Sequence, residues 1–114
     1  MWNKEKQNLL GILDAIEQIE EYISPFADTD EFFEHKINFD AVMMNFIIIG
    51  EMVDRLTDQF KEKYSHIDWI KIKGFRNIVA HDYFGIDAEE VWQIATIHLV
   101  LLKREVKQIL KEIE

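Results

Sequence analysis

The chain has 114 residues, 48% of them hydrophobic, and carries a formal net charge of −9 at pH 7. This length predicts a single domain, residues 1–114, that can bury a core of its own. The absence of cysteine excludes disulfide bonds and zinc–sulfur sites, and the acidic balance argues against a general nucleic-acid coat protein, which is usually basic.

The first 23 residues predict an amphipathic helix. The glutamates of this segment lie largely on one side of the helix, and the apolar residues lie on the other. The apolar residues recur at helical spacing: Leu9, Ile12, Leu13, Ile16, Ile19 and Ile23. Pro25 disfavours helix at Ser24 and should end it. Acidic residues interrupt the segment, so it is not a signal peptide, and no apolar run approaches the length of a membrane span. We therefore expect a cytoplasmic protein that does not contact a membrane.

A longer helical pattern extends from about residue 30 to residue 63, with a candidate break near Asn38. Residues 42–49 are apolar almost all round. This predicts burial on more than one side, in a bundle core or at a subunit interface. Gly50, inside the same helix, costs about 1 kcal/mol relative to alanine, and close approach of another helix would explain it.

The C-terminal half predicts a turn at residues 65–68, a short helix that includes residues 71–83, and a last helix that begins after Asp87. Asp87 is the expected N-cap, with Glu90 in the capping-box position. No segment shows the alternating pattern of a strand. We therefore predict an all-α, up-and-down bundle of four main helices, with room for one additional short helix.

One segment in the middle of the chain is clearly basic. Residues 1–54 carry three basic and twelve acidic side chains, whereas residues 55–76 carry six basic and three acidic ones. A basic patch on an acidic protein suits a focused phosphate site, with Lys71 and Lys73 as candidate RNA contacts. The same lysines also fit an ordinary solvated helix surface, and charge alone leaves both interpretations open.

The stretch "GFRNIVAHDYFGID", residues 74–87, places Arg76, His81 and Tyr83 within a short distance in the chain. At about 100° per residue, a helix here has a buried side and a polar side. The buried side comprises Ile72, Phe75, Ile78 and Val79, and the polar side comprises Arg76, Asn77, Ala80 and His81. A guanidinium binds phosphate and a histidine transfers protons near neutral pH. These groups suit metal-free RNA cleavage by the 2′-hydroxyl, although they also fit the ordinary polar edge of a helix.

Such cleavage is easiest with both an acid and a base, and this helix supplies one histidine. A symmetric dimer would bring two copies of Arg76 and His81 together, so the chemistry predicts a site at a dimer interface. The other histidines show no metal-ligand spacing, and we expect neither a metal site nor a cofactor. We expect Glu51 and Asp54 to have a structural role.

The segment "RNIVAHDY" matches the R-x-x-x-x-H-x-Y motif of the HepT-like branch of the HEPN superfamily. Two longer stretches also resemble this family, "NFDAVMMNFIIIGEMVDRL" with its I-G-E triplet and "HIDWIKIKGFRNIVAHDYFGIDAEEVW". The resemblance covers nearly the whole chain and is weakest in the first helix. It implies an all-α, homodimeric, metal-independent endoribonuclease, the toxin of a type II toxin–antitoxin pair.

The resemblance also implies roles for single residues. Arg76 and His81 match the catalytic pair of the family, and Asn77 matches the polar residue that supports the site. Tyr83 matches the tyrosine that receives AMP from an MNT-type nucleotidyltransferase antitoxin, which silences the nuclease. Adenylate on Tyr83 would compete for Arg76 and exclude RNA by charge and volume.

An alternative from a different functional class remains open. The chain would then be a non-catalytic helical module that binds a nucleotidyltransferase partner or its substrate. Near the motif, Asp82 and Asp87 are candidates for positioning the transfer of AMP.

Overall fold

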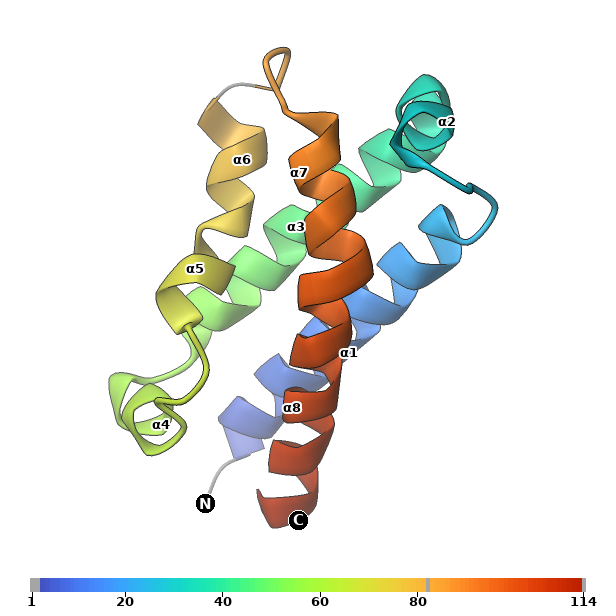
Figure 1. Cartoon of the computed structure of the whole chain (residues 1–114). Helices are drawn as coiled ribbons and strands as arrows, with labels where there is room; N and C mark the ends of the chain where they lie inside the picture. The colour runs from blue at the N-terminus through green and yellow to red at the C-terminus, as the bar shows by residue number, and fades with distance from the viewer. Residues whose placement is uncertain (1–2, 82, 114) are drawn as a thin grey trace.

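The computed structural model of the protein describes residues 3–81 and 83–113, and every regular element in these residues is helical. In chain order the elements are α1 Asn3–Ile23, α2 Thr29–Glu34, α3 Lys36–Arg55, α4 Asp58–Lys63, α5 Trp69–Lys73, α6 Phe75–His81, α7 Ala88–Gln93, η1 Ile94–His98 and α8 Leu99–Ile113. Four main helices are formed by α1, by α3, by α5 with α6, and by the continuous run α7–η1–α8 (Figure 1). The predicted all-α bundle is confirmed, with α2 and α4 as short additions.

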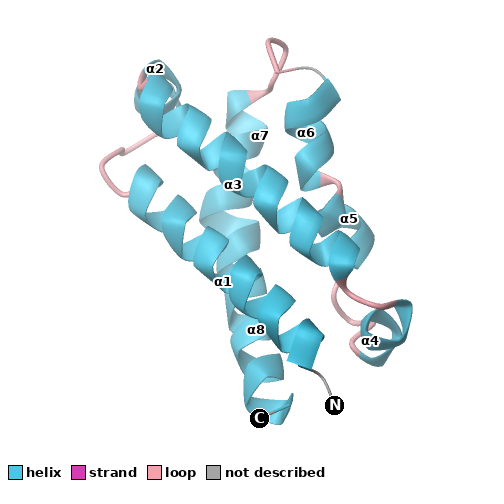
Figure 2. Ribbon diagram, turned by 180° about the vertical axis from the view of Figure 1, so that it is seen from behind, coloured by secondary structure: helices cyan, strands magenta, loops and turns pink. Residues whose placement is uncertain are grey.

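The helices α1 and α3 form the central pair of the bundle. They pack against each other along most of their lengths and run in opposite directions (Figure 2). The long rod α7–η1–α8 packs against α1, while α5 and α6 lie against α3. The helix that carries the motif is therefore positioned mainly by α3.

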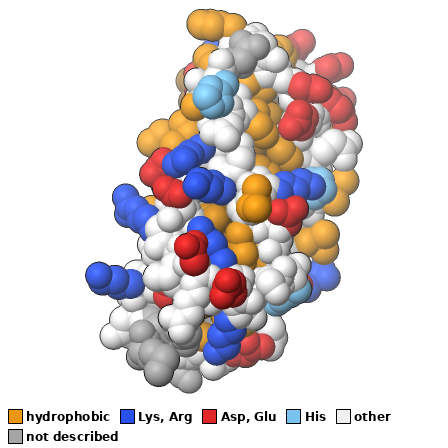
Figure 3. All heavy atoms as spheres, turned by 90° about the vertical axis from the view of Figure 1, so that its left-hand side faces the viewer, with side chains coloured by type: hydrophobic (Ala, Val, Ile, Leu, Met, Phe, Trp, Pro, Cys, Tyr) orange, Lys and Arg blue, Asp and Glu red, His pale blue; other side chains and the backbone are white. Residues whose placement is uncertain are grey.

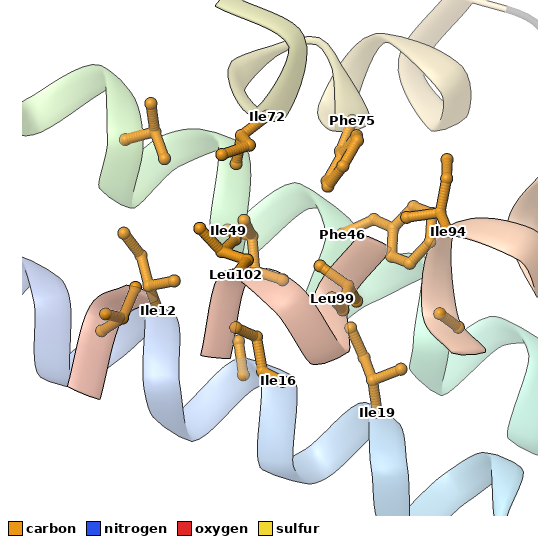
Figure 4. Close-up of a cluster of buried hydrophobic side chains, with 14 of the residues drawn as sticks. Ile12, Ile16, Ile19, Phe46, Ile49, Ile72, Phe75, Ile94, Leu99 and Leu102 are labelled. Carbon is orange, nitrogen blue, oxygen red and sulfur yellow. The ribbon is translucent and has the colours of Figure 1, made fainter. Parts of the chain in front are cut away.

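The hydrophobic core lies where these four helices converge. Figure 4 shows Ile12, Ile16 and Ile19 of α1 facing side chains of α3 and of the C-terminal rod, with Ile72 and Phe75 on the far side. Each fully buried side chain of this size stabilises the fold by roughly 1.5–3 kcal/mol relative to its exposed state.

The buried side predicted for the motif helix is only partly confirmed. Ile72 and Phe75 are buried, but Ile78 and Val79 are only half-buried. The difference arises because Ile78 lines a hollow between α6 and the C-terminal rod, and Val79 lines a shallow groove on α3, so neither side chain is fully covered.

The long pattern predicted from residue 30 to residue 63 is divided into three helices. The first break lies at His35, whose ψ of 83° is not helical, rather than near Asn38, which lies within α3. A second, unpredicted break follows α3 at Leu56, where the backbone is extended. Thr57 then caps α4, because its hydroxyl accepts a hydrogen bond from the Phe60 backbone N–H at 3.2 Å.

The predicted turn at residues 65–68 and the predicted N-cap at Asp87 are confirmed. The short helix predicted to include residues 71–83 is instead divided at Gly74 into α5 and α6, and α6 ends at His81, before Tyr83. Asp68 accepts a hydrogen bond from the Lys71 backbone N–H at 3.0 Å and caps α5. Asp87 caps α7 by accepting from the backbone N–H groups of Glu89 and Glu90. The last helix contains a π-helical turn, η1, that the apolar pattern did not indicate. Among the described helices, none combines the length and the apolar character that a bilayer span requires.

The glycine in the middle of α3 marks a close helix crossing. A Cβ atom at Gly50 would lie 2.8 Å from the Cβ of Arg76 and 3.0 Å from the backbone oxygen of Lys73. Any larger residue would force α5 and α6 away from α3. The predicted reason for this glycine, the close approach of another helix, is confirmed.

Candidate active site on the face of α3 and α6

Arg76 lies on the side of α6 that faces α3. Its Nη1 atom donates a hydrogen bond to Glu51 Oε1 at 2.8 Å and lies 3.8 Å from Asp54 Oδ2. The side chain of Arg76 is 29% exposed, so the guanidinium is braced against α3 but still reaches solvent. Glu51 and Asp54 do have the structural contact expected of them, and that contact is with the central residue of the motif.

Lys73 belongs to the same ion-pair network. Its Nζ atom lies 2.8 Å from Asp54 Oδ1. The hydrogen bond and the charge of Lys73 lower the pKa of Asp54, and the charge of Arg76 adds to the effect. Figure 3 shows this side of the molecule, where basic and acidic side chains are interspersed with apolar ones. Lys73, a predicted RNA contact, therefore has an acidic partner within the chain.

Lys71, the other predicted RNA contact, lies away from Arg76. It is exposed and lines a hollow of about 250 Å³ between α5 and the C-terminal rod, together with His66, His98 and Glu105. The separation follows from helix geometry, because positions 71 and 76 differ by about 140° around a continuous helix axis. The structure does not bring Lys71 and Arg76 together.

Asn77 and His81 are both exposed on α6. Among the described residues, neither side chain has a hydrogen-bond partner, and both are open to solvent or to another molecule. Arg76 points toward α3 whereas His81 lies about 140° further around the helix. One protomer therefore presents a cation and an imidazole on the same helix but not directed at one common point.

Tyr83 is held by two residues at the start of α3. Its hydroxyl donates a hydrogen bond to Asp40 Oδ1 and accepts one from Lys36 Nζ at 2.6 Å. Lys36 Nζ also lies 4.6 Å from the centroid of the Tyr83 ring. The hydrogen bond to Tyr83, together with the nearby charge of Asp40, raises the pKa of Lys36.

Sequence reasoning missed Lys36 and Asp40. Their opposite charges at positions i and i+4 are visible in the sequence and lie 3.7 Å apart in the structure. Nothing in the sequence indicates that residue 83 would contact them, because it lies 47 positions from Lys36. Asp82, proposed to help position AMP transfer, lies outside the described residues, and Asp87 acts as the cap of α7.

The contacts that α6 and the segment after it make with α3 follow one another in order, and α3 and α6 run in opposite directions. Tyr83 meets Asp40, Val79 faces the middle of α3, and Arg76 meets Glu51. Between the two ends lies a shallow, mainly apolar groove of about 290 Å³ lined by Asp40, Met43, Met44, Ile47, Val79 and Tyr83. Arg76 and Tyr83 thus lie toward opposite ends of a single surface.

In the part of the chain that the structure describes, no group of three or more histidine, aspartate or glutamate side chains is placed to hold a metal ion. His66 forms an exposed pair with Glu105, with a nitrogen–oxygen distance of 2.9 Å. This pair lies in the hollow beside Lys71, away from the surface of α3 and α6.

Comparison with known proteins gives one family. A family model described as "Ribonuclease HepT-like" matches residues 12–109. A Methanocaldococcus jannaschii protein named as a candidate RNase is 32% identical over 109 residues, which cover 96% of this chain and 93% of that protein. The Thermococcus cleftensis protein named "Probable ribonuclease HepT" is 30% identical over 111 residues, which cover 97% of this chain and all of that protein (100%).

A longer relative contains a matching segment. This second Methanocaldococcus jannaschii protein is named for a gamma-glutamylcyclotransferase and a candidate RNase, and is 38% identical over 103 residues. The match covers 90% of this chain but 46% of that protein, so the chain spans about half of its length. No solved structure showed a significant match.

Proposed function

The chain belongs to the HepT-like ribonuclease family, and from this premise we propose that it is a metal-independent endoribonuclease that uses Arg76 and His81. The observation that carries the proposal is the state of Arg76. One guanidinium nitrogen is occupied by Glu51, and the partly exposed group has further N–H donors. A braced guanidinium of this kind can bind a phosphate with little further ordering.

The reaction we propose uses the RNA itself as the nucleophile. The 2′-oxygen attacks the adjacent phosphorus, a 2′,3′-cyclic phosphate forms, and the 5′-oxygen leaves with the electron pair of its bond to phosphorus. The exposed imidazole of His81 transfers protons in this step, and Arg76 stabilises the charge on the phosphate oxygens. Asn77, one turn before His81 and exposed, is positioned to bind a phosphate oxygen or the imidazole.

The reaction needs one group that accepts a proton and one that donates a proton, which supports a homodimer. Two α6 helices that face each other across a two-fold axis would supply two imidazoles and two guanidinium groups. Large apolar side chains on α3, on α5 and after the end of α6 are more than half exposed and support such a contact (Ile37 77%, Met44 57%, Ile70 86% and Phe84 99%). Exposed apolar patches often mark a protein interface.

We also propose that the nuclease is the toxin of a toxin–antitoxin pair in the cytoplasm. Its partner would be an MNT-type nucleotidyltransferase that transfers AMP to Tyr83. Adenylate on Tyr83 would occupy the groove lined by Val79 and Ile47 and place an anion on the surface that also carries Arg76. This position supports silencing by direct exclusion of RNA.

One observation favours the alternative, a non-catalytic module that binds a nucleotidyltransferase. Two carboxylates, Glu51 and Asp54, lie against the guanidinium of Arg76, and acidic groups at this position oppose the approach of a polyanion. Under this alternative the motif would serve partner binding alone, and purified protein would leave RNA intact.

A cleavage assay separates the two functions. Purified protein is incubated with a mixed-sequence RNA in excess EDTA, beside the variants Arg76→Ala and His81→Ala. We expect wild-type cleavage without metal, reduced roughly 100-fold or more in either variant. His66→Gln, which changes an exposed histidine outside the motif, is the matched control and should cleave normally. Intact RNA with the wild type, or equal cleavage by all proteins, would refute the nuclease.

A further inference from the structure

The clearest cluster of reactive groups apart from Arg76 and His81 lies at the start of α3. Lys36 and Asp40, one helical turn apart, both contact the hydroxyl oxygen of Tyr83. The ammonium donates to this oxygen at 2.6 Å, and the oxygen donates its proton to the carboxylate. A nucleophilic oxygen with a base and a cation in direct contact is the arrangement that activates a hydroxyl for covalent chemistry.

The structure distinguishes Tyr83 from the other two tyrosines of the chain. Tyr64 is 5% exposed and its hydroxyl is enclosed. Tyr22 is partly exposed, but no side chain in the described residues hydrogen-bonds to its hydroxyl. Of the tyrosines described, Tyr83 alone has both a carboxylate and an ammonium on its oxygen.

We propose that Asp40 is the catalytic base, and Lys36 the stabilising cation, that make Tyr83 the acceptor of a transferred group. The inference rests on the proposed function for the identity of that group, AMP from a nucleoside triphosphate held by a nucleotidyltransferase. The Tyr83 oxygen bonds to the α-phosphorus, and the bond from that phosphorus to the oxygen of the β-phosphate breaks. Pyrophosphate leaves with the electron pair, and the phenolic proton passes to Asp40.

The same contacts describe what the modification changes. After transfer the Tyr83 oxygen is an ester oxygen and can no longer donate to Asp40. The new phosphodiester is an anion, which the Asp40 carboxylate repels and the Lys36 ammonium attracts. Lys36 therefore exchanges its contact with the hydroxyl for one with the phosphate, and the apolar groove beside Val79 receives the nucleoside.

The nucleophilicity of Tyr83 can be tested without the partner protein. The probe is 5′-fluorosulfonylbenzoyl adenosine, whose sulfur forms a bond to a phenolic oxygen as fluoride leaves. The full-length protein is labelled under limiting conditions, and the sites are mapped by peptide mass spectrometry. We expect labelling at Tyr83, absent in Tyr83→Phe and unchanged in the control Tyr22→Phe.

The role of Asp40 is read from the labelling rate at Tyr83. We expect Asp40→Asn to slow this rate about tenfold or more and Asp40→Glu to restore part of it, because a carboxylate is again available. Lys36→Met should slow it by a smaller factor. A change of less than twofold in Asp40→Asn, or labelling of Tyr22 as fast as Tyr83, would overturn the inference.

Two controls separate this inference from other effects. The melting temperature of each variant is measured, and Asp40→Glu carries the test if Asp40→Asn does not fold. RNA cleavage in EDTA is measured on the unlabelled wild type. If the protein leaves RNA intact but Tyr83 is labelled at a rate that depends on Asp40, the nuclease proposal is refuted and the inference about Tyr83 stands. If the protein cleaves RNA but labelling of Tyr83 does not depend on Asp40, the inference about Tyr83 is refuted and the nuclease proposal stands.

Discussion

Gly50 of α3 and Arg76 of α6 are in close contact where the two helices pack, and a Cβ atom on the glycine would lie 2.8 Å from the arginine Cβ. The contact places the Arg76 guanidinium beside Glu51, the next residue of α3. The absence of a side chain at one position thus fixes the location of the candidate phosphate-binding group at another.

Replacing this glycine should therefore affect both stability and the site. Gly50→Ala gains up to about 1 kcal/mol of helix propensity. Its methyl group would, however, clash with the Cβ of Arg76 and the backbone oxygen of Lys73, which costs about 1–3 kcal/mol. We expect a net loss of about 1 kcal/mol in the free energy of unfolding, together with slower RNA cleavage.

Gly11→Ala is the matched control for this substitution. Its added Cβ atom would meet only the flexible side chain of Met52, at 3.0 Å, so it should be neutral or stabilising. Chemical denaturation of both variants provides the measurement. Equal stability of the two would show that the crossing of α3 and α6 tolerates a methyl group.

Glu51 should act as a positioning residue for Arg76. In Glu51→Ala the guanidinium keeps its charge but loses its anchor, and misplacement of a catalytic group by about 1 Å can cost up to roughly 100-fold in rate. We expect kcat for RNA cleavage to fall about tenfold or more. The KM for RNA should not rise, because the substitution also removes a carboxylate that repels the RNA phosphates.

Glu51→Gln tests the same contact without the charge. Its amide oxygen still accepts a hydrogen bond from Arg76, so most of the cleavage rate should return. Glu62→Ala removes an exposed glutamate of α4 and serves as the control for net charge. Cleavage by Glu51→Ala at the wild-type rate would show that Arg76 does not need this brace.

The ion pair of Asp54 with Lys73 should make a small, pH-dependent contribution to stability. The pKa of Asp54 in the folded protein is lowered, chiefly by Lys73. The contribution is therefore present above the unfolded pKa, about 3.9, and is lost as the pH falls through the lower folded pKa. We expect Asp54→Asn to lower the melting temperature slightly at pH 7 and to have less effect at pH 3 and below.

The control for this pH dependence is Asp14→Asn, which changes an exposed aspartate of α1. Its melting temperature should stay close to that of the wild type throughout the titration. A difference between wild type and Asp54→Asn that grows as the pH falls would contradict the sign of the shift.

The proposed shared site predicts complementation between inactive variants. Arg76→Ala and His81→Ala protomers are mixed, allowed to exchange and assayed for RNA cleavage. Random exchange places roughly half of the dimers in mixed form. Each mixed dimer keeps one Arg76 and one His81 at the shared site, whereas each parent dimer lacks one of these residues entirely. We therefore expect the mixture to cleave RNA faster than either parent, though more slowly than the wild type.

Sedimentation at micromolar concentration checks the dimer independently. Met44→Glu places a charge on an exposed apolar position beside α6 and should weaken association, whereas Leu101→Glu on α8 should not. A monomeric wild type, or a mixture no more active than its components, would remove the shared site.

The helical elements could be predicted because helix periodicity is a local property. A few neighbouring residues are enough to predict the apolar side of α1, the turn at Asp68, the N-cap Asp87 and the position of Gly50 inside a helix. The break after α3 was missed because Leu56 and Phe60 continue the apolar spacing, while the capping hydroxyl of Thr57 gives a weaker signal. The π turn in the last helix has no such local signature.

The residue pattern alone was enough to predict an all-α bundle and the HepT-like motif with its residues Arg76, Asn77, His81 and Tyr83. The side chains that these residues contact became visible in the folded structure. Glu51 lies 25 positions from Arg76, and Asp40 lies 43 positions from Tyr83. Such pairs depend on how two helices dock rather than on the period of either one, and here the docking is set by the space that Gly50 leaves for α6.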